Sequence, residues 1–139
     1  MRADITEIVA GRAPLPNCAV SLGGKAVEAR DGYFKATFDA REEFYNLGNV
    51  VQGGFLAAML DDTLGPAVIT TMNEDEVHST VDLHVQYLRP ATAGQLTGEA
   101  RVTHRGKTVR MAEATLSTAD GKIIARASCS CVIRQLSGS

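Results

Sequence analysis

The chain has 139 residues, of which 45% are hydrophobic and 22% charged, and its formal net charge is −2. This length supports one hydrophobic core, so we expect a single domain over residues 1–139. The mixed, nearly balanced charge gives no electrostatic footprint for nucleic acid or an anionic membrane. No apolar run approaches the roughly 20 residues that cross a bilayer. The N-terminus is too polar for a signal peptide, and we therefore expect a cytoplasmic protein.

The first residues predict a short helix and an irregular lead-in, over residues 1–15. Ile5, Ile8 and Val9 have helical spacing, and the segment 11–16, rich in Gly and Pro, ends the helix.

Short elements are predicted next. Turn residues separate three expected strands, which are 18–22, 25–30 and 33–38. The pair Asp31-Gly32 is a hairpin signal between the last two. The segment 40–52 looks irregular, with one helical turn at 41–44.

A long apolar helix is predicted over residues 53–72. It begins at Gly53-Gly54, and a helix start made of glycines exposes backbone N–H groups that can polarise a carbonyl oxygen. Pro66 is expected to kink this helix or divide it, because proline lacks the N–H of the helical ladder. Asp61 and Asp62 interrupt the apolar pattern, and a carboxylate on a buried helical face is costly unless something uses it.

The remainder of the chain predicts antiparallel strands over residues 77–134. Alternation of apolar and polar residues marks four strands, which are 77–88, 95–104, 108–118 and 122–134. The segments between them carry the turn residues Gly and Pro or an Asp-Gly pair. One apolar helix followed by an antiparallel meander predicts an α+β domain with the helix packed on the sheet.

Cysteine and histidine residues do not predict a metal site. Three cysteines are an odd number, which fits reduced thiols, and Cys129 and Cys131 lie two apart on one strand face. No second Cys or His pair completes a metal-ligand set, so burial in the core is the simplest role for both. We expect no metal site.

Several motifs occur in a distinctive order along the chain. Asn46 precedes Gln52-Gly53-Gly54, and Asp61 follows on the same predicted helix. The segment 81–90 then ends in Arg-Pro, and the chain continues through Gly94 to Arg105-Gly-Lys107. In this order the motifs resemble the phenylacetyl-CoA (PaaI-type) branch of the hotdog-fold thioesterases. The resemblance covers roughly residues 30–134.

The resemblance implies a hotdog fold, in which the sheet wraps around the long helix. It implies hydrolysis of acyl-CoA thioesters without a metal or redox cofactor, by homodimers that carry their sites at the interface and often pair into tetramers. By position, Asp61 would be the nucleophile or the general base for water. Gly53 would supply the N–H that polarises the thioester carbonyl. Asn46 would position substrate or water, and Thr80 would orient the water.

Other roles remain open for each of these side chains. Asp61 could be a buried acid bonded to an amide or hydroxyl, and Asp62 fits a structural role better than a catalytic one. Asn46 is by default a turn residue, and Thr80 is by default a strand former.

Gln52 departs from the family pattern, which has His before Gly-Gly. An amide can donate a hydrogen bond to the thioester oxygen, but it cannot shuttle a proton near neutral pH. A non-catalytic acyl-CoA-binding module is therefore the alternative function. A hotdog dehydratase or hydratase fits less well, because those relatives need an Asp–His pair.

Further residues are candidates for binding the substrate. Gly54 and Phe55 open the helix, and Phe55 belongs to a predicted apolar pocket wall with Leu56, Met59 and Leu60. Three basic residues at strand ends or turns could contact the phosphates of CoA, namely Arg89, Arg105 and Lys107.

The spacing of the motifs predicts a dimer if these roles are right. Gln52 and Asp61 are nine residues apart, which is about 13 Å along a helix. One chain therefore cannot bring the Gly53 N–H and Asp61 to the same carbonyl, whereas two antiparallel copies of the helix can. We expect a homodimer with shared sites, and a dimer of dimers.

Overall fold

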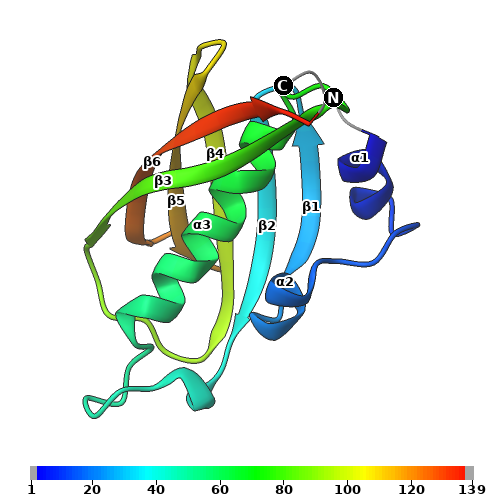
Figure 1. The fold of residues 1–139 in the computed structure, drawn as a ribbon. Helices are drawn as coiled ribbons and strands as arrows, with labels where there is room; N and C mark the ends of the chain where they lie inside the picture. The colour runs from blue at the N-terminus through cyan, green and yellow to red at the C-terminus, as the bar shows by residue number, and fades with distance from the viewer. Residues whose placement is uncertain (1–2, 137–139) are drawn as a thin grey trace.

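The computed structural model describes residues 3–136 and shows one long helix lying across a curved antiparallel sheet (Figure 1). The central helix is α3 (Gly53–Ile69). The other helices are short, and they are α1 (Ala3–Val9), α2 (Asn17–Ser21) and the 3-10 turn η1 (Glu42–Phe44). The strands are β1 (Lys25–Arg30), β2 (Tyr33–Ala40), β3 (Glu76–Tyr87), β4 (Gly94–Arg105), β5 (Val109–Thr118) and β6 (Ile123–Gln135). This architecture confirms the predicted α+β hotdog fold.

The six strands are ordered β1-β2-β4-β5-β6-β3, and every neighbouring pair is antiparallel. β3 follows α3 in the chain but lies at one edge of the sheet, beside β6. β1 forms the other edge. Among residues 3–136, the ladder of β3 is therefore paired on one side only.

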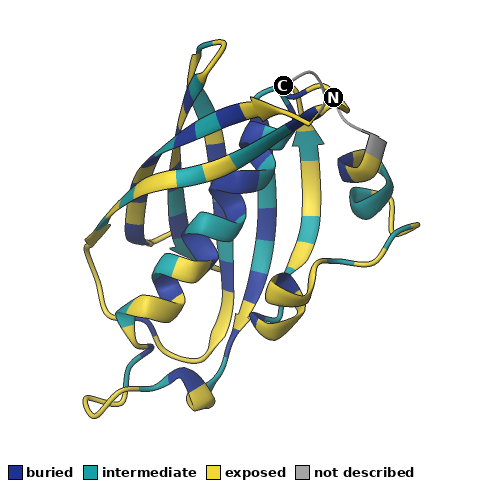
Figure 2. Cartoon of the chain, viewed as in Figure 1, coloured by how far each residue is buried: buried dark blue, intermediate teal, exposed yellow. Residues whose placement is uncertain are grey.

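The core lies between α3 and the inner face of the sheet. The helix packs chiefly on β2, β4 and β5. Buried residues alternate with partly buried and exposed ones along it (Figure 2). The side chains of Met59, Leu60 and Leu64 are fully buried there. Burial of a side chain of this size contributes about 1.5–3 kcal/mol to folding. Asp61, by contrast, lies on the part of the helix that is only partly covered.

The predicted strand at 18–22 is wrong, because these residues form α2 and its C-cap. Ala19 and Leu22 are both buried, and their spacing of three residues places them on one side of a helix. Pro16 precedes the helix, and its carbonyl accepts a hydrogen bond from Val20 N at 3.1 Å. A strand would have turned one of the two apolar side chains to solvent.

The central helix ends at Ile69, three residues before the predicted end. Two threonines stop it, because the hydroxyl of Thr70 donates to Ala67 O and that of Thr71 donates to Val68 O, both at 2.6 Å. Pro66 does not divide the helix, which is continuous through it. No helix within residues 3–136 is long and apolar enough to cross a membrane.

A β-bulge interrupts β3. Thr80 pairs with Cys131 and Asp82 pairs with Ser130, which leaves Val81 as an extra residue that is 59% exposed. The Asp82 carboxylate accepts a hydrogen bond from Ser130 N at 3.0 Å and fixes this geometry. The phase of the alternation predicted for 77–88 therefore changes at Val81: Leu83 and Val85 point to the core as predicted, whereas before the bulge it is Thr80 that faces the helix.

Candidate functional site

Asp61 points from α3 toward the edge strand β3. The hydroxyl of Thr80 donates a hydrogen bond to Asp61 Oδ1 at 3.3 Å. Asp61 is partly buried, and no Lys, Arg or His within residues 3–136 forms an ion pair with it. The carboxylate is therefore held by a neutral hydroxyl and keeps acceptor positions for a further ligand.

Thr80 also contacts the buried cysteines of β6. Its Oγ1 lies 3.9 Å from Cys131 Sγ, and Cys131 Sγ lies 4.0 Å from Cys129 Sγ. The hydrogen bond between the two thiols lowers the pKa of Cys131 below its usual value and raises the pKa of Cys129. Both cysteines are buried, as predicted, but Cys131 also adjoins the candidate site.

Asp62 lies on another side of α3 and does not share this environment. Its Oδ1 lies 3.5 Å from Cys18 Sγ on α2, and burial raises its pKa to about 6. It borders an apolar cavity of about 150 Å³ beneath α1, on the side of the helix that packs toward β1 and β2. The structure therefore separates the two carboxylates, in line with the structural role expected for Asp62.

The start of α3 is built around Gly53. Tyr87, at the end of β3, donates a hydrogen bond to Gly53 O at 2.8 Å. A Cβ atom at residue 53 would lie 3.1 Å from Cζ of the Tyr87 ring, so the close approach favours glycine. Sequence reasoning did not identify Tyr87, because only the sheet order brings the end of β3 beside the helix start.

Gln52 is the N-cap residue of α3, with extended backbone (φ −64°, ψ 138°) and no side-chain capping bond. Its Oε1 would lie 2.7 Å from a Cβ atom at residue 54, so glycine at 54 leaves room for the amide of Gln52. Phe55 N donates to the carbonyl oxygen of Gln52 at 3.0 Å, whereas the N–H groups of Gly53 and Gly54 receive no cap from the Gln52 side chain and are the ones available to a ligand.

Asn46 shapes the loop before the helix. Its Oδ1 accepts hydrogen bonds from Gly48 N at 2.9 Å and from Val50 N at 3.5 Å. Asn49 adopts a positive φ of 58° in the same loop. The structure thus gives Asn46 the turn role, and a substrate role stays a prediction.

The predicted apolar pocket wall is only partly present. Phe55 is partly exposed and stacks on Phe44, with ring centroids 4.2 Å apart. Leu56 borders a depression of about 300 Å³ beside Gly53. Met59 and Leu60, however, are fully buried in the core and cannot line an open pocket in this chain.

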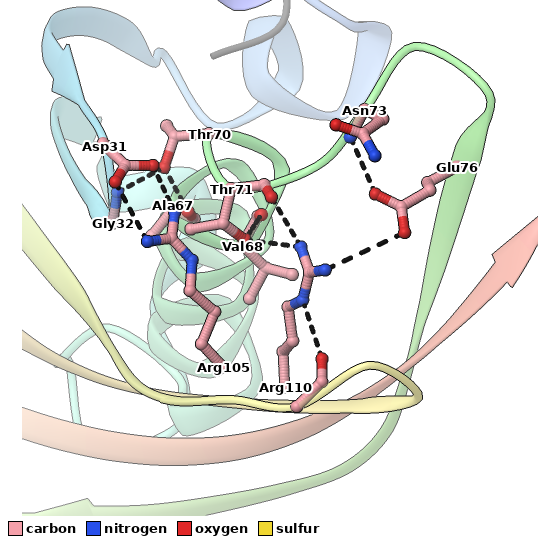
Figure 3. A network of polar contacts seen from close by, with 11 residues as sticks. Asp31, Gly32, Ala67, Val68, Thr70, Thr71, Asn73, Glu76, Arg105 and Arg110 are labelled. Carbon is pink, nitrogen blue, oxygen red and sulfur yellow. Dashed lines mark hydrogen bonds and ion pairs between the residues drawn. The ribbon is translucent and has the colours of Figure 1, made fainter.

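The three basic candidates lie at opposite ends of α3. Arg89 borders the depression beside Gly53. Arg105 lies near the C-terminal end of the helix, where it pairs with Asp31 (Nη1 to Oδ2, 3.0 Å; Figure 3). Lys107 is exposed in the turn between β4 and β5, and no ion pair to it is found within the described part of the chain.

A buried arginine, which sequence reasoning missed, holds the C-terminal end of α3. Arg110 donates to Thr71 O at 2.7 Å and to Gly106 O at 3.2 Å (Figure 3). Its Nη2 atom lies 3.8 Å from Oε2 of Glu76. Arg110 is 8% exposed and Glu76 is 5% exposed. The sequence did contain a signal for this buried arginine. Arg110 alternates in the same phase of β5 as Ala112, Ala114 and Leu116, which are buried.

The residues at the two ends of the site do not meet within one chain. Gly53 and Asp61 are eight residues apart on α3, which is about 12 Å along the helix axis. Within residues 3–136 there is no group of three or more His, Cys, Asp or Glu side chains placed to hold a metal ion. The chain thus presents an oriented carboxylate beside an edge strand and uncapped amides at the helix start.

Comparisons with known proteins agree with this geometry. The model of the family "Thioesterase superfamily" matches residues 48–125. A protein named "Putative esterase" from Saccharolobus solfataricus is 32% identical over 106 residues, which are 76% of this chain and 75% of that protein.

Solved structures give the same result. One is titled a "putative thioesterase, phenylacetic acid degradation-related protein" from Ralstonia eutropha JMP134. It has a TM-score of 0.86 and 37% identity, and the match covers 92% of this chain and 98% of that one. A thioesterase family protein from Silicibacter pomeroyi has a TM-score of 0.84 at 21% identity, covers 94% of this chain and 98% of that one, and shows the fold alone. The hotdog resemblance is confirmed, and the chain belongs to the thioesterase superfamily, whose members hydrolyse thioesters.

Proposed function

We propose that this enzyme hydrolyses acyl-CoA thioesters to a free acid and CoA, with Asp61 as nucleophile or general base. The observation that carries the proposal is the Asp61 carboxylate, which has no cationic partner within residues 3–136 and accepts a hydrogen bond from Thr80. Asp61 also lies within residues 48–125, the segment that matches the thioesterase superfamily, and this supports the same role. The aromatic pair Phe44 and Phe55 near the helix start favours an aryl or medium-chain acyl group.

In the proposed reaction the thioester carbonyl lies at the start of α3. The Gly53 N–H polarises its oxygen, with the helix dipole adding to the effect, and the Gln52 amide donates a second hydrogen bond. Asp61 of the other copy in the dimer either attacks the carbonyl carbon or removes a proton from the attacking water, which Thr80 and Asn46 help to orient. The tetrahedral intermediate then collapses and expels CoA as a thiolate, a leaving group that needs no acid. On the nucleophilic route this leaves a mixed anhydride on Asp61, which a water molecule hydrolyses to the free acid and the restored carboxylate.

The proposed active form is a homodimer. Asp61 lies beside Thr80 of β3, an edge strand whose outer ladder is unpaired within residues 3–136. A second copy that approaches across this edge, with its helix antiparallel, brings its own Gly53 toward Asp61. Exposed Val81 on the same edge offers apolar surface for the contact. Dimers of dimers are a further expectation of the proposal.

The proposal is tested by release of free thiol from a panel of aryl-, short- and medium-chain acyl-CoAs, with phenylacetyl-CoA first. Asp61→Asn should lower kcat by about 100-fold or more, because it removes the base or nucleophile. Asp62→Asn is the matched control, since it neutralises the adjacent acid that faces away from the site. Equal losses in the two variants, or no thiol release by the wild type, would contradict the mechanism.

Shared sites are tested with mixed dimers. Gly53→Pro removes the N–H at the first helical position and adds a Cβ atom against the Tyr87 ring, so it disables the helix start in two ways, while the extended backbone of Gln52 suits a residue before proline. Gly53→Pro and Asp61→Asn should each be inactive alone. Randomly mixed chains should recover about a quarter of wild-type activity, because half of the dimers carry one intact site out of two. No recovery would show that each site belongs to one chain.

A further inference from the structure

We propose that Cys131 is a positioning residue for this reaction, because its thiol donates to Thr80 Oγ1 and so holds the Thr80 proton on Asp61. The inference rests on the proposed function of Asp61. It concerns a side chain that is completely buried and does not touch substrate.

The fold places Cys131 directly behind Thr80. The two residues are paired across β3 and β6, one position before the bulge at Val81. Their side chains approach to 3.9 Å, while Thr80 Oγ1 lies 3.3 Å from Asp61 on the other side. Thr80 therefore stands between a thiol and a carboxylate.

The direction of these hydrogen bonds follows from the number of protons. An ionised carboxylate only accepts, so the single hydroxyl proton of Thr80 must point to Asp61. Cys131 must then be the donor in its contact with Thr80. The sulfur of Cys131 can accept in turn from the thiol of Cys129, 4.0 Å away.

Cys129 and Cys131 are exceptions on an otherwise apolar inward face of β6. The other inward side chains of this strand are apolar, and they include Ala125, Ala127 and Ile133. Cys129 and Cys131 are the polarisable donors on this face within the described residues. Only Cys131 of the pair contacts Thr80.

The test compares variants of the whole chain at pH 6, so that Cys131 holds its proton. Thiol release is followed with a disulfide reagent that reacts with thiols in mild acid. Cys131→Ala and Cys131→Val both remove the donor, and we expect a fall in kcat of about tenfold with KM changed less than twofold. Cys131→Ser restores a donor and should recover at least about half of wild-type kcat. Cys129→Ala deletes a matched buried thiol two residues away and should lower kcat less than Cys131→Ala, at a similar loss in Tm.

A double-mutant cycle separates positioning from packing. If Cys131 acts through Thr80, Cys131→Ala should not lower kcat further in a Thr80→Val background. The inference is overturned if Cys131→Ala and Cys131→Val stay within twofold of wild type, or if the loss adds fully to that of Thr80→Val. A wild-type enzyme that releases no thiol would overturn the proposed function itself, and with it the inference.

Discussion

The phenol of Tyr87 donates its hydrogen bond to the carbonyl oxygen of Gly53, so the last residue of the edge strand β3 holds the first residue of the central helix. The contact joins the two elements that carry the candidate site. β3 supplies Thr80 at one point along its length and Tyr87 at another.

Tyr87→Phe should lower kcat several-fold, because the helix start loses the hydroxyl that holds its first carbonyl. Loss of one partly exposed hydrogen bond should cost about 1 kcal/mol in the free energy of unfolding. Tyr45→Phe is the control, since the Tyr45 hydroxyl accepts a bond from Ala93 N at 2.7 Å and does not contact Gly53. Thiol-release kinetics and urea unfolding of both variants provide the measurement. Equal kcat values for the two variants would show that Tyr87 does not support catalysis.

Lys107→Ala should raise KM for acyl-CoA by about fivefold if Lys107 binds the nucleotide phosphates. The same variant should leave KM unchanged for an N-acetylcysteamine thioester, which lacks the nucleotide. Arg105→Ala should have a smaller effect on KM, because the Arg105 guanidinium is already paired with Asp31. A rise in KM for both kinds of substrate would place Lys107 in another role.

Arg110→Met should lower the free energy of unfolding by about 3–5 kcal/mol, because it removes a buried guanidinium that bonds Thr71 O and Gly106 O and pairs with the Glu76 carboxylate. The double variant with Glu76→Gln should recover part of this loss. Arg105→Met breaks an exposed ion pair near the same helix end and should cost less than about 1 kcal/mol. Urea unfolding measures all three, and similar losses for Arg110→Met and Arg105→Met would contradict the prediction.

The stability of the protein should increase as the pH falls through about 6, owing to Asp62. Burial raises the pKa of Asp62 from 3.8 to about 6, so the folded state binds more protons at this site than the unfolded chain between these values. Because the carboxyl is partly solvated, the gain should be about 1 kcal/mol. Asp62→Asn should remove this gain, whereas Asp39→Asn, at an exposed position, should retain it. Identical pH profiles of Tm for wild type and Asp62→Asn would exclude the effect.

Periodicity predicted the elements that bury a regular face. The long helix and the four C-terminal strands follow from alternation and from the apolar run after Gly53, and the motif order predicted the hotdog fold. Local context decided the exceptions. Ala19 and Leu22 needed a helix to reach the core together, and Thr70 and Thr71 ended α3 early by binding its last carbonyls.

The candidate site was predictable only in part. Asp61 and Thr80 meet, as their motif positions implied, but their roles stay predictions until kinetics test them. Tyr87 and Cys131 reach the site through strand pairing between distant segments, which no local pattern reveals. The buried role of Arg110 could have been predicted from the sequence. It occupies an apolar, inward position of its strand, and a buried charge is costly unless it is paired.

The extra residue at Val81 has a consequence for both ends of the site. In a regular strand, residues an odd number apart point to opposite faces, and Thr80 and Tyr87 are seven apart. The bulge changes the phase between them, so both side chains reach the same helix. Deleting Val81 would therefore not merely shorten an exposed edge. Without this residue, β3 could place Thr80 beside Asp61 or Tyr87 beside Gly53, but not both.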